Sequence, residues 1–90
     1  MDLLAQAQRP ASEADDALVR RAAAGEVAAF DALIVVRMDH CFRLAWSILA
    51  NEADAADATQ DAFVVAWREL PRLRQTGAFD GWLHRIVANA

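Results

Sequence analysis

The side chains best suited to chemistry lie in a short segment that follows a proline at position 71. The segment offers two guanidinium groups, an amide, a hydroxyl and a glycine, on Arg72, Arg74, Gln75, Thr76 and Gly77. Guanidinium groups pair with phosphates, amides pair with base edges, and glycine lets a backbone approach a ligand closely. These features predict a loop that holds one extruded base and its flanking phosphates. The alternative is an ordinary polar connection.

A second polar set follows at once along the chain. His84, Arg85 and Asn89 share one broad face of a predicted helix. Asparagine pairs with a base edge, arginine with phosphate or guanine, and histidine stacks on a base or donates a hydrogen bond. The face is therefore predicted to contact an unpaired strand, with a merely solvated polar face as the alternative.

A third set is acidic and lies before the loop. Asp57, Gln60 and Asp61 share one side of a predicted helix. Two carboxylates around an amide that both donates and accepts would suit a docking face for a basic partner. Carboxylates near a helix start also stabilise the helix by themselves, so a capped, solvated helix start is the alternative.

Catalysis finds no support in the residue types. The two histidines, His40 and His84, lack a serine or cysteine partner at an activating spacing, and no glycine-rich phosphate loop is present. The adjacent His40 and Cys41 point about 100° apart on a helix, which disfavours a shared metal. We expect no enzyme, no metal and no cofactor, and we expect Cys41 to be a small core residue.

The composition predicts an all-α fold that positions these sets. Of the 90 residues 57% are hydrophobic, many of them alanine, with only three glycines and two prolines. We expect a flexible lead-in at residues 1–11 and one domain of three or four helices at residues 12–90. The first helix is short, with Ser12 as its cap and Gly25 at its end, and the second is long and covers about residues 26–50. The third helix runs from an N-cap at Asp54 to Pro71, and the fourth begins near Phe79. Asn51 suits the end of the long helix.

Apolar spacing predicts which side chains face the core. The first helix contributes Leu18, Val19, Ala22 and Ala23; the second Phe30, Leu33, Ile34, Met38, Cys41, Leu44, Ala45, Ile48 and Leu49; the third Phe63, Ala66, Trp67 and Leu70; the fourth Phe79, Trp82, Leu83, Ile86, Val87 and Ala90. Trp46 lies at the margin of its stripe. The chain ends at Ala90 without a capping residue, which predicts that the last helix continues in a longer protein.

Charge is distributed unevenly along the chain. Residues 1–67 hold five arginines against eleven acids, and residues 68–90 hold four arginines against two, within a net charge of −4. This polarity favours a protein partner for the first part and a nucleic acid for the last. No apolar run is long enough for a membrane span, and the N-terminus does not resemble a signal peptide. A single cysteine fits a reducing cytoplasm, where we expect the protein.

Four pieces of the sequence, in order, resemble region 2 of bacterial extracytoplasmic-function (ECF) sigma factors. They are Ala24-Gly25-Glu26-Val-Ala-Ala-Phe30-Asp-Ala-Leu33, then Asp54 to Arg68, the loop to Phe79, and Gly81 to Ala90. The resemblance implies that Asp57, Gln60 and Asp61 grip the clamp helices of the RNA polymerase β′ subunit. It implies that the loop from Leu73 to Ala78 pockets a flipped base of the −10 promoter element, and that His84, Arg85 and Asn89 position the unpaired non-template strand. Anti-sigma factors can cover the first two helices in this family.

The sequence departs from the family pattern at several positions. Ala58 stands where a larger aliphatic residue is common, His84 where an aromatic is common, and Val65 where a basic residue is common. The family's second DNA-binding domain, for the −35 element, has no counterpart in these 90 residues. A sigma-like adaptor or decoy that binds protein without melting DNA is the alternative function.

Overall fold

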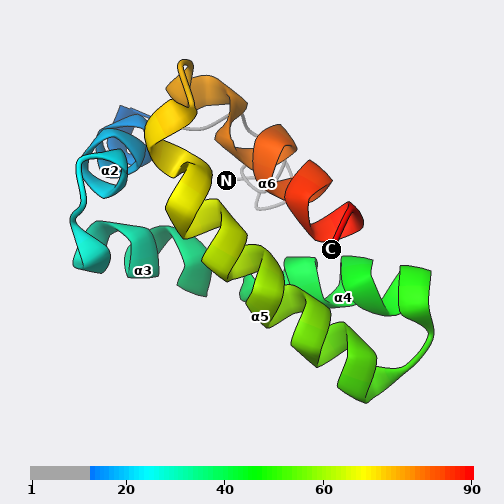
Figure 1. Ribbon diagram of the computed structural model, residues 1–90. Coiled ribbons are helices and arrows are strands. Elements are labelled where there is room, and N and C mark those ends of the chain that lie inside the picture. The colour runs from blue at the N-terminus through cyan, green and yellow to red at the C-terminus, as the bar shows by residue number, and fades with distance from the viewer. Residues whose placement is uncertain (1–12) are drawn as a thin grey trace, which may run out of the picture.

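The computed structural model describes residues 13–90, and these residues are helical with no strands (Figure 1). The elements in order are α2 (Glu13–Ala23), α3 (Val27–Val35), α4 (Met38–Leu49), α5 (Glu52–Glu69), the 3₁₀ turns η1 (Leu70–Arg72) and η2 (Thr76–Ala78), and α6 (Phe79–Ala88). The all-α prediction is therefore confirmed. The predicted lead-in at residues 1–11 and the Ser12 cap lie outside the described residues.

The helices form two groups that share α5. In Figure 1, α5 runs diagonally across the molecule, with α4 and α6 on one side of it and α2 and α3 on the other. Helix α2 packs on α3, and α4, α5 and α6 pack against one another. Small side chains let these helices approach closely, because a methyl group separates the backbones less than a larger side chain does. The buried alanines are Ala22, Ala29, Ala45, Ala55, Ala62 and Ala66.

The predicted long helix over residues 26–50 is wrong, because the chain bends at Val36 and Arg37. The Arg37 N–H donates to the Ile34 carbonyl at 2.9 Å, a tight turn that ends α3 and starts α4. The bend lets α3 bury its apolar side against α2 while α4 faces α5 and α6. A straight helix could not reach both groups with one stripe.

Arg37 holds this bend in place from inside the fold. Its side chain is only 13% exposed and its Nε lies 2.6 Å from the Asp80 Oδ1, at the start of α6. Another guanidinium nitrogen donates to the Leu33 carbonyl at 2.8 Å, and the group lies 5.2 Å from the centre of the Phe79 ring. A weaker ion pair reaches Asp15 on α2 at 3.8 Å. One side chain thus ties α2, the bend and α6 together.

The turn between α4 and α5 also differs from the sequence prediction. Asn51, and not Asp54, is the N-cap of α5, because its side-chain oxygen accepts the Asp54 N–H at 2.9 Å. This cap requires extended backbone at Asn51. The left-handed residue that ends α4 is therefore Ala50, with a φ of 53°.

The predicted end of the first helix at Gly25 is confirmed. Gly25 follows α2 with a φ of 104°, a backbone conformation that suits glycine.

The predicted core is largely confirmed, with exceptions at helix ends. Phe30, Leu33, Ile34, Cys41 and Ala45 are buried, as are Leu70, Phe79, Leu83 and Val87. Met38, Ile48, Leu49 and Ala90 were predicted to be buried but are exposed. Met38 follows the bend, and the other three lie at the last residues of α4 or beyond α6, where no neighbouring helix covers them. Trp67 and Trp82 are partly buried and pack against the core.

Cys41 is a buried core residue, as predicted. Burial raises the pKa of its thiol above the ordinary 9.0; the Arg37 charge lowers this pKa and the Asp80 charge raises it, both less than burial does. Because the pKa of Cys41 is higher in the folded chain than in the unfolded chain, its contribution to the free energy of unfolding is fully present below about pH 9. This contribution is lost as the pH rises through the folded pKa.

We expect Cys41 in the native chain to react far more slowly with iodoacetamide than Cys41 in the urea-unfolded chain. Mass spectrometry would measure both rates. Equal rates would contradict the burial.

Candidate functional site

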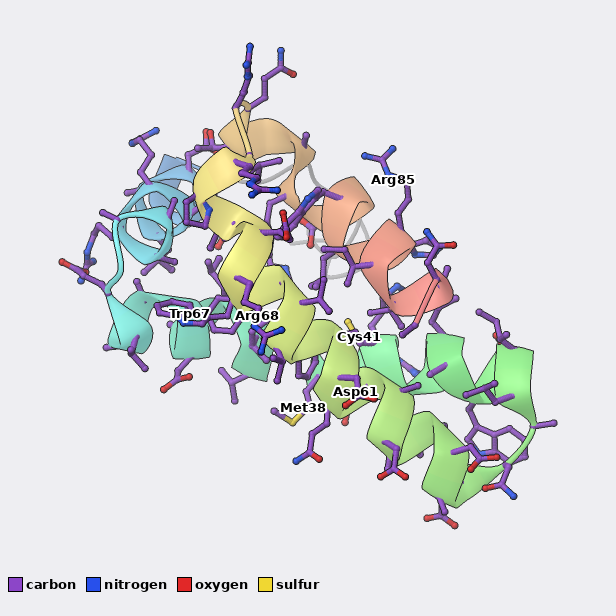
Figure 2. All side chains as sticks on the ribbon, in the orientation of Figure 1. Met38, Cys41, Asp61, Trp67, Arg68 and Arg85 are labelled. Atoms are coloured by element: carbon purple, nitrogen blue, oxygen red, sulfur yellow. The ribbon has the colours of Figure 1, made fainter. Side chains whose placement is uncertain are left out.

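The outer face of α6 carries the three side chains predicted to contact a strand. His84, Arg85 and Asn89 are all exposed, while Leu83 and Val87 on the opposite face are buried. Figure 2 shows Arg85 projecting away from the helical bundle into solvent. The face is held in register because Phe79, the first residue of α6, is completely buried. The arrangement presents donors and an imidazole on a rigid element.

The loop before α6 is anchored at both ends and open in its middle. Leu70 is fully buried and Leu73 packs against the core, so the loop cannot swing freely. Arg74 and Gln75 lie between η1 and η2 and are exposed, and Thr76 is half-buried. A Cβ placed on Gly77 would meet nothing within 4 Å, so packing within the chain does not require glycine there.

Arg72 differs from the other loop residues in having a local partner. Its guanidinium lies 3.1 Å from the Glu69 carboxylate, three residues earlier. The pair is strongly exposed on the arginine side, and exposed ion pairs contribute little to stability. A phosphate could replace Glu69 as the partner without leaving a buried charge behind. Arg72 therefore remains suited to a phosphate contact.

A groove between α5 and α6 joins two sets that the sequence analysis kept apart. The groove has a volume of about 380 Å³. Its lining residues are Asp61, Ala62, Val65, Trp82, Arg85, Ile86, Asn89 and Ala90. Asp61, predicted to face a protein partner, thus shares a surface with Arg85 and Asn89, predicted to face a strand. The groove combines an apolar floor with donors and one carboxylate at its rim.

The predicted acidic patch is exposed but does not form a single flat surface. Asp57, Gln60 and Asp61 are all exposed on α5. Gln60 lines grooves on the side of α3 and α4, whereas Asp61 lines the groove on the side of α6. In Figure 2 Asp61 and Arg68 lie on the face of α5 turned toward the viewer, with Trp67 toward α3. A partner that touches all three predicted residues must therefore straddle the ridge of α5.

An apolar groove beside Gln60 was missed by the sequence analysis. Its volume is about 370 Å³ and its walls are almost entirely apolar. It is lined by Val27, Phe30, Gln60, Phe63, Val64 and Trp67. The Phe30 and Trp67 rings in its lining pack edge to face, with their centres 5.2 Å apart. The signal was in the sequence, because Phe63, Val64, Val65 and Ala66 are four consecutive apolar residues and a helix cannot bury all of them on one face.

Within residues 13–90 no group of three or more histidine, cysteine, aspartate or glutamate side chains is arranged to hold a metal ion. None of the helices that the structure describes has the length and apolar character needed to cross a membrane.

The comparisons with known proteins agree with this geometry. The family model described as Sigma-70 region 2 matches residues 35–90 of this chain. The ECF RNA polymerase sigma-E factor of Escherichia coli (strain K12) is 39% identical over 75 residues, which are 83% of this chain and 39% of that protein. The ECF RNA polymerase sigma factor SigE of Mycolicibacterium smegmatis is 40% identical over 60 residues, 67% of this chain and 23% of that protein. The RNA polymerase sigma-H factor of Pseudomonas aeruginosa is 35% identical over 77 residues, 86% and 40%.

The helical fold, the exposed site and these matches together show that the chain belongs to the sigma-70 region 2 family. Within that family it is a region 2 domain of the ECF sigma factor type, as the sequence resemblance predicted. This membership agrees with the expectation that the domain is not an enzyme. The chain spans between about a quarter and two fifths of the curated relatives named above.

Proposed function

We propose that this domain, residues 12–90 of the chain, docks on core RNA polymerase through α5 and captures the unpaired non-template strand of a −10 promoter element. In this proposal Asp57, Gln60 and Asp61 contact the β′ clamp helices. The strand is held by the loop and the outer face of α6, through Arg72, Arg74, Gln75, Thr76, Gly77, His84, Arg85 and Asn89. The observation that carries the proposal is that all these side chains are exposed or half-exposed on one folded unit of the sigma-70 region 2 family.

Promoter melting of this kind needs no covalent chemistry. It requires only that the unpaired strand binds more tightly than the paired one, and extruding a base costs a few kcal/mol that pocket contacts and stacking must offset. The mildly basic last quarter of an acidic chain would bind free DNA weakly. Docking on polymerase would raise the effective concentration of the strand near the loop, so capture would be confined to the assembled enzyme. Such a partner would place the domain in the cytoplasm.

A protein-binding adaptor or decoy without DNA melting is the second candidate function. The apolar groove beside Gln60 favours it, because exposed valines at 27 and 64, which are 60% and 50% exposed, suit a protein partner. The same surface would serve polymerase docking or an anti-sigma factor. The two functions differ in what they require of α6: only strand capture needs the donors at His84, Arg85 and Asn89.

The test is a change at Asn89. Asn89→Ala should weaken the binding of a single-stranded −10 oligonucleotide to polymerase loaded with this chain by roughly 5–150-fold, the loss of one bidentate base contact. Fluorescence anisotropy with a labelled oligonucleotide measures this affinity. Binding is expressed per docked complex, so that a docking defect does not imitate a strand defect.

Asp57→Ala is the matched control for that experiment. Asp57 is exposed on α5 but does not line the groove that contains Asn89, whereas Asp61 does. Per docked complex, Asp57→Ala should leave strand affinity unchanged. Equal effects of the two changes would contradict the proposed division between docking and strand capture. Normal docking with no strand binding even in the parent chain would favour the adaptor.

A further inference from the structure

The two histidines of the chain lie side by side although they are far apart in sequence. His40 is on α4 and His84 is on α6, and these helices pack against each other. Their ring centres are 6.1 Å apart and the rings are tilted by 39°. Both side chains are exposed, so both rings can turn about their side-chain torsions. The pair is the kind of arrangement in which two imidazoles face a common space.

That separation is close to what a shared metal ion requires. A first-row divalent metal lies about 2.0–2.1 Å from each imidazole nitrogen, and at coordination angles of roughly 90–120° this places two ring centres about 4.5–5.5 Å apart. The observed 6.1 Å is somewhat longer. Binding one ion therefore requires the two exposed rings to turn toward each other.

The surroundings of the pair identify which groups can be ligands. A small cavity of about 70 Å³ lies between the helices and is lined by Arg37, His40, Cys41, Asp80 and His84, together with two leucines. Asp80 is engaged by Arg37 through both oxygens, at 2.6 and 3.4 Å. The Cys41 side chain is buried in the core and, as the residue next to His40 on α4, points about 100° away from it. The two imidazoles are the donors that remain.

The charge of Arg37 does not oppose a cation strongly. The Asp80 carboxylate pairs with it closely and Asp15 lies 3.8 Å from it, so the positive charge is largely compensated. The chain as a whole carries a net charge of −4. Two neutral imidazoles suit zinc, nickel and copper and suit magnesium or calcium poorly, because the last two prefer oxygen ligands.

We propose that His40 and His84 bind one imidazole-preferring divalent cation, such as Zn²⁺, between α4 and α6. Water completes the coordination sphere, so the site is exchangeable and differs from a closed structural zinc site. The bound ion would add a second link between two helices that packing and the Arg37–Asp80 ion pair already join. This proposal goes beyond the proposed function and does not depend on it. If His84 also faces the strand, the bound ion would take that ring away from DNA, and this consequence alone rests on the proposed function.

The test is metal titration of the 90-residue chain. Isothermal titration calorimetry with Zn²⁺ at pH 7.5 should show saturable binding of one ion per chain. The melting temperature, followed by circular dichroism, should rise by roughly 5–10 °C when the Zn²⁺ concentration is ten times the dissociation constant, because the ion binds the folded state alone. Mg²⁺ at the same concentration should produce neither effect. Absence of saturable Zn²⁺ binding up to about 1 mM would overturn the proposal.

Variants assign the binding to the two rings. His40→Ala and His84→Ala should each abolish both the one-to-one binding and the rise in melting temperature, and both should fold because both positions are exposed. Cys41→Ala should keep the binding, since the thiol is not a ligand. Survival of the one-to-one site in either histidine variant would overturn the proposal in favour of the acidic surface. Addition of Cu²⁺ should broaden the proton NMR signals of both rings together, and broadening of one alone would also overturn it.

Discussion

Replacing Asp61 with arginine is expected to abolish binding of this domain to an isolated β′ clamp-helix fragment. Asp61 is exposed on α5, so the change leaves the fold intact, and helicity should be nearly unchanged. Placing a like charge against a basic partner costs several kcal/mol, which weakens binding by about 100-fold or more. Calorimetric titration of the parent and variant chains against the fragment measures this loss directly.

Asp31→Arg is the matched control for Asp61→Arg. It makes the same change of net charge at an exposed acid on α3 and away from α5. Docking should survive in Asp31→Arg and disappear in Asp61→Arg. Loss in both variants would mean that net charge governs the interaction. Unchanged docking in Asp61→Arg would remove this residue from the proposed interface and leave the apolar groove beside Gln60 as the stronger candidate.

Replacing Arg37 with alanine is expected to lower the free energy of unfolding by about 2–3 kcal/mol. The change removes the charged hydrogen bonds to Asp80, the bond to the Leu33 carbonyl and the contact with the Phe79 ring. For a domain of this size the melting temperature should fall by roughly 8–20 °C. Urea unfolding followed by circular dichroism gives the free energy. An unchanged unfolding midpoint would contradict this role.

Arg37→Lys separates charge from geometry in the same experiment. Lysine keeps the positive charge but cannot form the two-pronged contact with the Asp80 carboxylate or stack as flatly on Phe79. It should recover only part of the stability. Asp80→Ala should cost less than Arg37→Ala, because the Asp80 side chain is 55% exposed and exposed ion pairs contribute little. The same cost for both variants would assign the whole effect to the ion pair.

The helical class, two helix ends and the two faces of α6 could be predicted from the sequence alone. Gly25 and Pro71 end helices for local reasons, since one adopts a left-handed backbone and the other removes a donor. The 3.6-residue period places Leu83 and Val87 inside and Arg85 and Asn89 outside whatever the helix packs against. Local rules therefore sufficed for these two helix ends and for the two faces of α6.

The sequence alone does not reveal features that depend on a contact with a residue far along the chain. Nothing between Val35 and Met38 is a glycine or proline, so no local signal marks the bend; it exists because Arg37 reaches Asp80 on a helix much later in the chain. Met38 was predicted to be buried for the same reason, since its place in the stripe assumed a straight helix. Asn51 and Asp54 are both good caps, and the choice between them depends on how α5 meets α4.

What the sequence by itself determined is the helical class, the family and the polar residues exposed for binding. What only the tertiary structure decided is which of those residues share a surface: Asp61 with Arg85 and Asn89 in one groove, Gln60 on the other side of the ridge, and His40 beside His84. The physical reason is that periodicity fixes the direction of a side chain about its own helix axis. The distance between two helices depends instead on the packing of small core residues such as Ala45, Ala62 and Ala66, which only the folded chain brings together.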